Sequence, residues 1–199
     1  MAIHHKKKAV SMQSLPDDFE ELDEIHELNR VFLRYLKQRL ESRGEALELP
    51  SSSLAALARA NNALLDRAAE FPRALFRLRL ERWMPWKLMD PKPASLDAAQ
   101  QALQLTLLLS AWNLSRRSAY AARLFLGLSE AETRRLRASQ LSDLHRLALS
   151  CDLIGCAFAQ TNWLWPELLR DTRPEQRQQL SLIALQPDVA GKTPEEARR

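Results

Sequence analysis

Apolar residues at three- and four-residue steps in the first quarter of the chain limit the fold more than any other feature. The apolar positions are Leu22, Ile25, Leu28, Phe32, Tyr35, Leu36 and Leu40. This spacing places them on one face of an amphipathic helix of about seven turns. Pro16 suits the first turn of such a helix, and Gly44 suits its end.

A second apolar segment predicts a different kind of helix. The leucines at 103, 105, 107, 108 and 109, together with Trp112, surround a helix axis instead of marking one stripe. A helix that is apolar on most sides is buried on most sides. We therefore expect a central core helix here, or a helix buried at a subunit interface.

The rest of the chain predicts shorter helices and no strand. The chain contains only four glycines, and its abundant Leu, Ala, Arg, Gln and Glu favour helix. Helical pieces are expected within 49–86 and 115–186, including the segment CDLIGCAFA. Ser129 with Glu132, and Thr172 with Glu175, have the spacing of capping boxes. The predicted fold class is all-α.

The chain also matches itself when it is shifted by 79 residues. The matches are Leu47 with Leu126, Leu49 with Leu128, Leu57 with Leu136, Leu65 with Leu144, Arg67 with Arg146, Ala69 with Ala148 and Trp86 with Trp165. Each half closes on a tryptophan pair, in ERWMPWKLMD and in TNWLWPELLRD. An internal repeat of this length predicts a duplication, with two similar multi-helix halves packed as a pseudo-dimer. The expected organisation is a disordered basic tail over 1–14, repeat 1 over 15–90, a linker DPKPAS at 90–95, repeat 2 over 96–186 and a second tail over 187–199.

The segment LGLSEAETRRLRASQLSDLHRLALSCDLIGCAF, residues 126–158, resembles the middle of the bacterial flagellar transcriptional regulator family FlhD. The similar positions are Leu126, Gly127, Leu128, Ser129, Glu130, Leu136, Leu141, Leu144, Leu147, Ala148, Leu153 and Cys156. The resemblance implies an all-helical, dimer-forming regulator that assembles with a zinc-bearing partner, FlhC, to activate transcription. It also implies that Cys156 is a candidate dimer cysteine. The chain departs from the family because it is nearly twice the usual length and has LPSSS in place of the Leu-Gly turn in its first half.

Charge is distributed unevenly along the chain. Residues 15–48 carry ten acids against five bases, whereas residues 115–149 carry seven arginines against three acids. The candidate DNA-binding residues are Arg116, Arg117, Arg123, Arg134, Arg135, Arg137 and Arg146. A helix, a short ASQ turn and a second helix over 141–150 fit a degenerate helix-turn-helix. The second helix is leucine-rich, so a solvated or partner-facing arginine surface is the alternative.

The four paired tryptophans are candidate partner-interface residues: Trp83, Trp86, Trp163 and Trp165. Core packing is the alternative for each. Residues two apart on a helix point in different directions, so Trp163 and Trp165 cannot both face one core.

Catalytic and metal sites are not indicated. The four histidines are scattered, there is no glycine-rich phosphate loop, and Cys151 and Cys156 lack metal-type spacing. We therefore expect a non-enzyme without cofactor or metal, in which the two cysteines are packed thiols. No apolar stretch is long enough to span a bilayer, and we expect a cytoplasmic location.

The functional hypothesis is a FlhD-like transcriptional regulator or regulatory subunit that acts through protein assembly and DNA contact. Its partners would be duplex DNA, and either an FlhC-like subunit or further copies of the chain. The alternative is a helical adaptor or secretion-type accessory protein that binds no nucleic acid.

Overall fold

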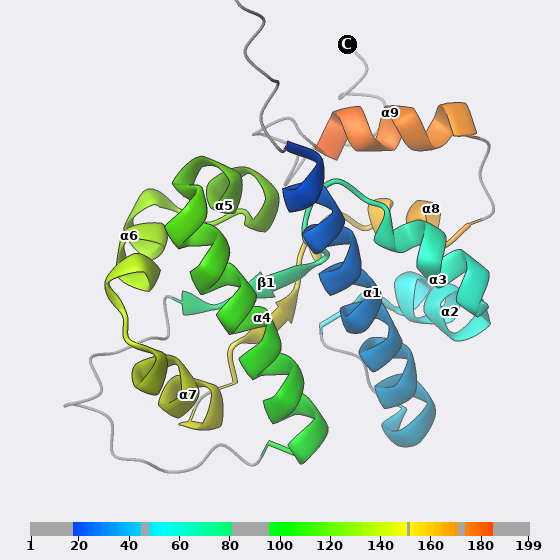
Figure 1. Ribbon diagram of the computed structural model, residues 1–199. Helices are drawn as coiled ribbons and strands as arrows, with labels where there is room; N and C mark the ends of the chain where they lie inside the picture. Colours follow the sequence, from blue (N-terminus) through cyan, green and yellow to red (C-terminus); the bar gives the residue numbers. More distant parts are fainter. Residues whose placement is uncertain (1–17, 45–47, 81–95, 151, 171–173, 185–199) are drawn as a thin grey trace, which may run out of the picture.

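The computed structural model describes residues 18–44, 48–80, 96–150, 152–170 and 174–184, and this part is mostly helical (Figure 1). Its nine helices are α1 (Asp18–Arg43), α2 (Ser51–Arg59), α3 (Asn62–Ala69), α4 (Ala98–Arg117), α5 (Ala119–Leu126), α6 (Glu130–Ala138), α7 (Leu141–Ser150), α8 (Leu164–Leu168) and α9 (Pro174–Ala184). Two three-residue strands, β1 (Phe76–Leu78) and β2 (Ile154–Cys156), also occur in these ranges. The all-α prediction is confirmed. The predicted tails over 1–14 and 187–199 and the linker at 90–95 lie outside the described residues.

Helix α1 follows the predicted apolar spacing. Ile25, Phe32 and Leu36 are fully buried. Gly44 ends the helix in the left-handed conformation, with a φ of 69°, and its N–H donates to the carbonyl of Leu40 at 2.9 Å. Glycine adopts this conformation without the steric cost that a side chain would add. The predicted end at Gly44 is therefore confirmed.

Helix α4 crosses the middle of the molecule beside α1, and α5, α6 and α7 pack against it on the other side (Figure 1). It begins after Asp97, whose carboxylate accepts a hydrogen bond from the N–H of Gln100 at 2.7 Å. Its buried side chains are Gln100, Leu103, Gln104, Leu107, Leu108, Ala111, Leu114 and Ser115. Leu105, Leu109 and Trp112 are partly buried against the same core. The interpretation of this segment as a central core helix therefore holds.

The turn between α5 and α6 is fixed by two local signals that the sequence contains. Gly127 ends α5 with a φ of 66°. At the start of α6, the Ser129 hydroxyl accepts from the Glu132 N–H at 3.2 Å, and the Glu132 carboxylate accepts from the Ser129 N–H at 2.8 Å. This reciprocal capping satisfies two N–H groups that a helix start leaves without partners. The first predicted capping box is confirmed, whereas Thr172 of the second lies outside the described residues.

The strands correct one prediction, because the segments that contain them were expected to be helical. Strands β1 and β2 pair antiparallel, with Arg77 opposite Gly155. Phe76 and Leu78 are buried while Arg77 is exposed, which is the two-residue alternation of a strand. Such a short strand gains most of its stability from its partner, and the partner of β1 lies in the other half of the chain.

The order of elements in the first half recurs in the second half at the predicted offset of 79 residues. Adding 79 to the bounds of α2 gives 130–138, the bounds of α6. The same shift places α3 at 141–148, inside α7, and β1 at 155–157, one residue beyond β2. Four matched pairs are buried in both halves: Leu49 with Leu128, Leu57 with Leu136, Leu65 with Leu144 and Ala69 with Ala148. The agreement supports an internal duplication.

A buried amide on α1 ties the first half together. Asn29 is fully buried, and its Nδ2 donates to the carbonyls of Ala69, Phe71 and Arg73 at 3.2, 3.2 and 2.9 Å. Its Oδ1 accepts from the N–H of Leu75 at 2.7 Å. One side chain thus satisfies the backbone between the end of α3 and the start of β1, where no regular ladder can do so.

Helix α4 supplies a buried amide that does the same work in the second half. Gln104 Nε2 donates to the carbonyl of Ala148 at 2.8 Å, and its Oε1 accepts from the N–H of Leu153 at 2.9 Å. Ala148 is the residue that matches Ala69 at the offset of 79. Both halves therefore hold a strand beside a long helix by the same hydrogen-bonding scheme.

Candidate functional site

All seven predicted DNA-binding arginines are exposed, and all lie on helices α4 to α7. They are Arg116 and Arg117 at the end of α4, Arg123 on α5, Arg134, Arg135 and Arg137 on α6, and Arg146 on α7. In Figure 1 these four helices form one side of the molecule. The structure therefore places the predicted cationic residues on one group of packed helices.

Several of these arginines are engaged within the chain. Arg117 forms an ion pair with Glu24 of α1, which links the acidic first helix to the arginine-rich half. Arg134 pairs with Glu130 one turn away, with 2.6 Å between Nη2 and Oε1. Arg135 Nη1 donates to the carbonyl of Leu80 at 3.5 Å, so it reaches towards the first half.

The remaining exposed arginines include three that face no carboxylate. Within the described ranges, no ion pair involves Arg116, Arg123 or Arg137. The guanidinium of Arg116 lies over the ring of Trp112, 4.8 Å from its centroid. Such stacking holds the cation in place and leaves its N–H groups directed outward.

Helices α6 and α7 follow one another with two residues between them, at the positions predicted for the helix-turn-helix, and both pack against α4. The Trp112 indole N–H donates to the carbonyl of Ser139 at 3.1 Å and attaches the turn to α4. The inner face of α7 buries Leu144, Leu147 and Ala148. Its outer face exposes Leu141, Ser142, His145, Arg146 and Leu149. Two large apolar side chains on this face are unusual for a helix that reads DNA bases.

Trp163 and Trp165 differ in burial, although Trp163 comes just before α8 and both pack against the same core, contrary to the prediction that they could not. Trp165 is 1% exposed, and its indole N–H donates to the carbonyl of Ala157 at 2.9 Å. Trp163 is half-buried at the edge of the core. Trp165 is therefore a core residue and not a surface contact, and Trp163 alone of this pair stays accessible. Trp83 and Trp86, and with them the comparison of Trp86 with Trp165, lie outside the described residues.

Cys156 is a packed thiol. It is buried, and desolvation, followed by the nearby charge of Glu48, raises the pKa of the thiol well above its usual range. A thiol kept protonated is a poor nucleophile and exchanges slowly. These properties favour the packing interpretation over the dimer cysteine that the family resemblance implies. Cys151 lies outside the described residues.

The part of the chain that the structure describes contains neither a group of metal ligands nor a membrane-spanning helix. No group of three or more His, Cys, Asp or Glu side chains comes together there as metal ligands. Among the described helices, none combines the length and the apolar character needed to cross a bilayer.

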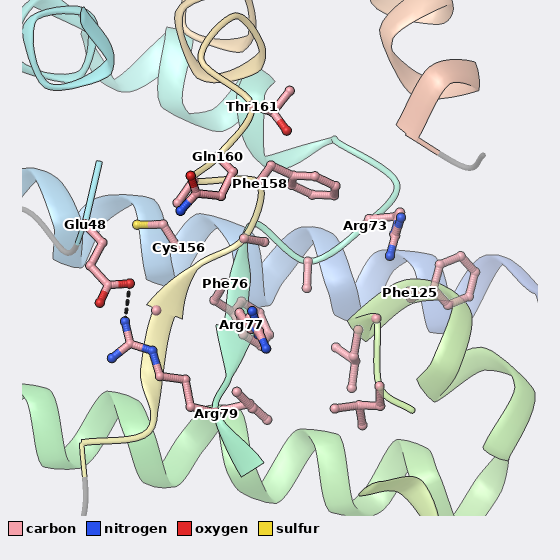
Figure 2. Close-up of a pocket in the computed structure, with 18 of the residues that line it drawn as sticks. Glu48, Arg73, Phe76, Arg77, Arg79, Phe125, Cys156, Phe158, Gln160 and Thr161 are labelled. Atoms are coloured by element: carbon pink, nitrogen blue, oxygen red, sulfur yellow. Dashed lines mark ion pairs between the residues drawn. The ribbon is translucent and has the colours of Figure 1, made fainter. Parts of the chain in front are cut away.

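The structure also reveals a pocket that sequence reasoning missed. Its volume is about 360 Å³, and its walls come from both halves of the chain (Figure 2). One wall is the segment 73–79, around β1; the others are the turn at 125–128 and the segment 155–161, around β2. The pocket therefore lies where the two halves meet.

Three arginines line this pocket. Arg79 is 8% exposed and forms an ion pair with Glu48. The guanidinium of Arg73 lies 5.3 Å from the centroid of the Phe158 ring, and burial lowers the pKa of Arg73. Arg77 is exposed and lies between the other two arginines (Figure 2). The lining thus has a concentration of positive charge beside an aromatic ring.

The sequence contains a signal for this site. Phe76, Leu78 and Leu80 alternate with Arg77 and Arg79, and residues two apart on a strand point to the same side. Reading the segment as helix separates the arginines, whereas reading it as strand brings them together.

Comparisons with protein-family models, curated proteins and solved structures give no match to this chain.

Proposed function

We propose that the chain is a FlhD-like transcriptional regulatory subunit, which assembles with a protein partner and contacts duplex DNA through α4 to α7. The observation that carries the proposal is the exposure of all seven arginines on these four helices. Arginine contacts to phosphate release counterions and give affinity without sequence specificity. Within the described residues, Arg116, Arg123 and Arg137 have no ion pair to lose, so we expect them to contribute most.

The test is binding to a generic duplex across a salt series. The variant carries Arg116→Ala, Arg123→Ala and Arg137→Ala. Each lost phosphate contact should reduce the slope of log K against log salt by about 0.9. The expected reduction is thus about 2–3 for the triple variant.

A control variant of equal charge removes three exposed arginines elsewhere, namely Arg34→Ala, Arg59→Ala and Arg170→Ala. The control variant should keep most of the slope of log K against log salt, although it carries three fewer positive charges than the wild type and so binds more weakly at every salt concentration. Equal slope losses in the two variants would refute the assignment to α4–α7. The absence of wild-type binding at low salt would refute direct DNA contact.

The outer face of α7 favours a second candidate function, a helical adaptor that binds no nucleic acid. Leu141 and Leu149 are 58% and 41% exposed and lie on either side of His145, one helical turn from it in each direction. Exposed apolar side chains in line on a helix are typical of a protein interface. The salt series separates the two functions, because an adaptor gives no DNA binding at any salt concentration.

We further propose that the two halves form a pseudo-dimer that replaces a homodimer. The antiparallel pairing of β1 with β2 and the matched burial of equivalent residues support this proposal. A chain that satisfies the interface internally should sediment as a monomer. An intertwined homodimer built on residues 103–126 would contradict it.

A further inference from the structure

The pocket between the two halves has the features of a ligand site that is independent of the DNA-binding proposal. We propose that it binds a small organic anion, with the oxyanion beside Arg73 and Arg77 and a flat apolar portion against Phe158. An aryl carboxylate and an aryl phosphate share this chemistry. Figure 2 shows Arg73, Phe158 and Phe125 towards one end of the pocket, and Arg79 with Glu48 at the other.

The charges that line the pocket favour an anion. Three arginines and two glutamates contribute to its wall. Glu48 is directed to Arg79 by their ion pair. Glu132 is held in the capping box of α6, where its carboxylate accepts from the hydroxyl and the N–H of Ser129 at 2.6 and 2.8 Å. Each of the two carboxylates thus has a partner other than Arg73 and Arg77. The described lining residues carry a net positive charge, which an oxyanion would meet in a partly desolvated site, where charged hydrogen bonds are strong.

The size of the pocket favours an organic molecule over a bare inorganic ion. A volume of about 360 Å³ corresponds to about a dozen water molecules at roughly 30 Å³ each. It lies at the lower end of the range for small-molecule pockets, about 300–1,000 Å³. Phe158 and Phe125 supply apolar wall, while Thr161, which is 4% exposed, supplies a buried hydroxyl. That hydroxyl has no hydrogen-bond partner within the described structure, so a ligand could satisfy it.

The backbone around the pocket departs from common conformations, which is a feature of functional sites. The described chain has two residues other than glycine with positive φ, Glu48 at 52° and Phe158 at 55°, and both line the pocket. Each costs about 1 kcal/mol or more in isolation. Among the described residues other than glycine, this conformation therefore occurs only at residues that line the pocket.

Two glycines allow the arginines to approach the backbone closely. A Cβ added at Gly155 would lie 2.9 Å from Nη2 of Arg79 and 3.0 Å from its Nε. A Cβ added at Gly127 would lie 3.1 Å from Nη2 of Arg73. A side chain at Gly155 would force the guanidinium of Arg79 to shift, whereas one at Gly127 would require the guanidinium of Arg73 to move by a few tenths of an ångström. The second half therefore provides the space that the arginines of the first half occupy.

The test is the thermal unfolding midpoint of the full chain with four probes: benzoate, phenyl phosphate, inorganic phosphate and benzamide. Benzamide has the same ring as benzoate without its charge. At about ten times Kd, an aryl anion should raise Tm by roughly 3–6 °C, while benzamide should leave it unchanged. The comparison of benzoate with phenyl phosphate identifies the preferred oxyanion. Inorganic phosphate should give a smaller shift, because it lacks the ring.

Arg77→Gln is the main variant, because Arg77 is exposed and its replacement should leave the fold intact. This variant should lose most of the shift, whereas Arg59→Gln on α2, outside the pocket, should keep it. Equal stabilisation by benzamide and benzoate would overturn the proposal. A shift of Tm in Arg77→Gln as large as in the wild type would also overturn it. The same holds if neither aryl anion shifts Tm at about 10 mM, which is about ten times a millimolar Kd. None of these outcomes depends on whether the chain binds DNA.

Discussion

Replacing Asn29 with leucine should destabilise the protein strongly, because this buried amide accepts from one backbone N–H and shares its two N–H groups among three backbone carbonyls. Leucine is similar in size, so the main cost is the loss of hydrogen bonds. The N–H of Leu75 and the carbonyl of Arg73, bonded at 2.7 and 2.9 Å, would lose their partner. Each buried group left unsatisfied costs about 1–3 kcal/mol, and the two carbonyls bonded at 3.2 Å add less. Greater apolar burial offsets about 1–2 kcal/mol, which leaves a net loss of about 3 kcal/mol.

Urea unfolding followed by circular dichroism measures this loss. With an m-value of about 2 kcal/mol/M, the midpoint should fall by about 1.5 M. Gln104→Leu should cause a comparable loss, because its amide does the same work in the second half. Asn113→Leu, on the exposed side of α4, should change stability by at most about 0.5 kcal/mol. If Asn29→Leu behaved like Asn113→Leu, the claim that the amide holds the α3–β1 connection would be wrong.

Three further comparisons test the turn at Gly127, the cap of α6 and the partly buried His26. Gly127→Ala should lower the free energy of unfolding in urea more than Gly44→Ala does. Both glycines have positive φ, so both changes cost about 1 kcal/mol, but only the Cβ at Gly127 would contact Arg73. Equal costs would show that Arg73 moves freely. Ser129→Ala should lose about 1 kcal/mol through the α6 cap, and Ser129→Asp should recover most of it. Burial lowers the pKa of His26, so the unfolded chain takes up the proton more readily. The contribution of neutral His26 to the free energy of unfolding is therefore present above about pH 6.5, and it is lost as the pH falls below that value and the unfolded chain binds the proton. The urea midpoint should therefore drop less between about pH 7.5 and 5.5 in His26→Gln than in the wild type.

The features that sequence reasoning predicted correctly are those whose determinants are local. The end of α1 at Gly44 depends on residues within one turn, as does the capping box at Ser129. The burial of α4 follows from leucines on most sides of a single helix. Leucines that match at the offset of 79 residues, such as Leu57 and Leu136, are buried in both halves.

The strands and the pocket depend on contacts between residues far apart in the sequence, and sequence reasoning missed both. The alternation around β1 covers only a few residues, so it becomes clear only when β2 lies beside it. Asn29 and Gln104 interrupt apolar helix faces, and nothing local shows that each side chain meets a distant backbone segment. The pocket needs both halves, so its arginines had no evident common purpose in the sequence.

Under the proposed duplication, the seam of contact between the two halves permits an arrangement that a symmetric dimer does not. At the offset of 79, Arg77 and Arg79 of the first half correspond to Cys156 and Phe158 of the second. Two identical strands would place the same arginines on both sides of the seam, and the like charges would repel one another at close range. In the single chain one half carries the guanidinium groups, while the other carries Gly155, whose missing side chain leaves room for Arg79. An asymmetric pocket can form at such a seam because each copy of the sequence is free to change alone.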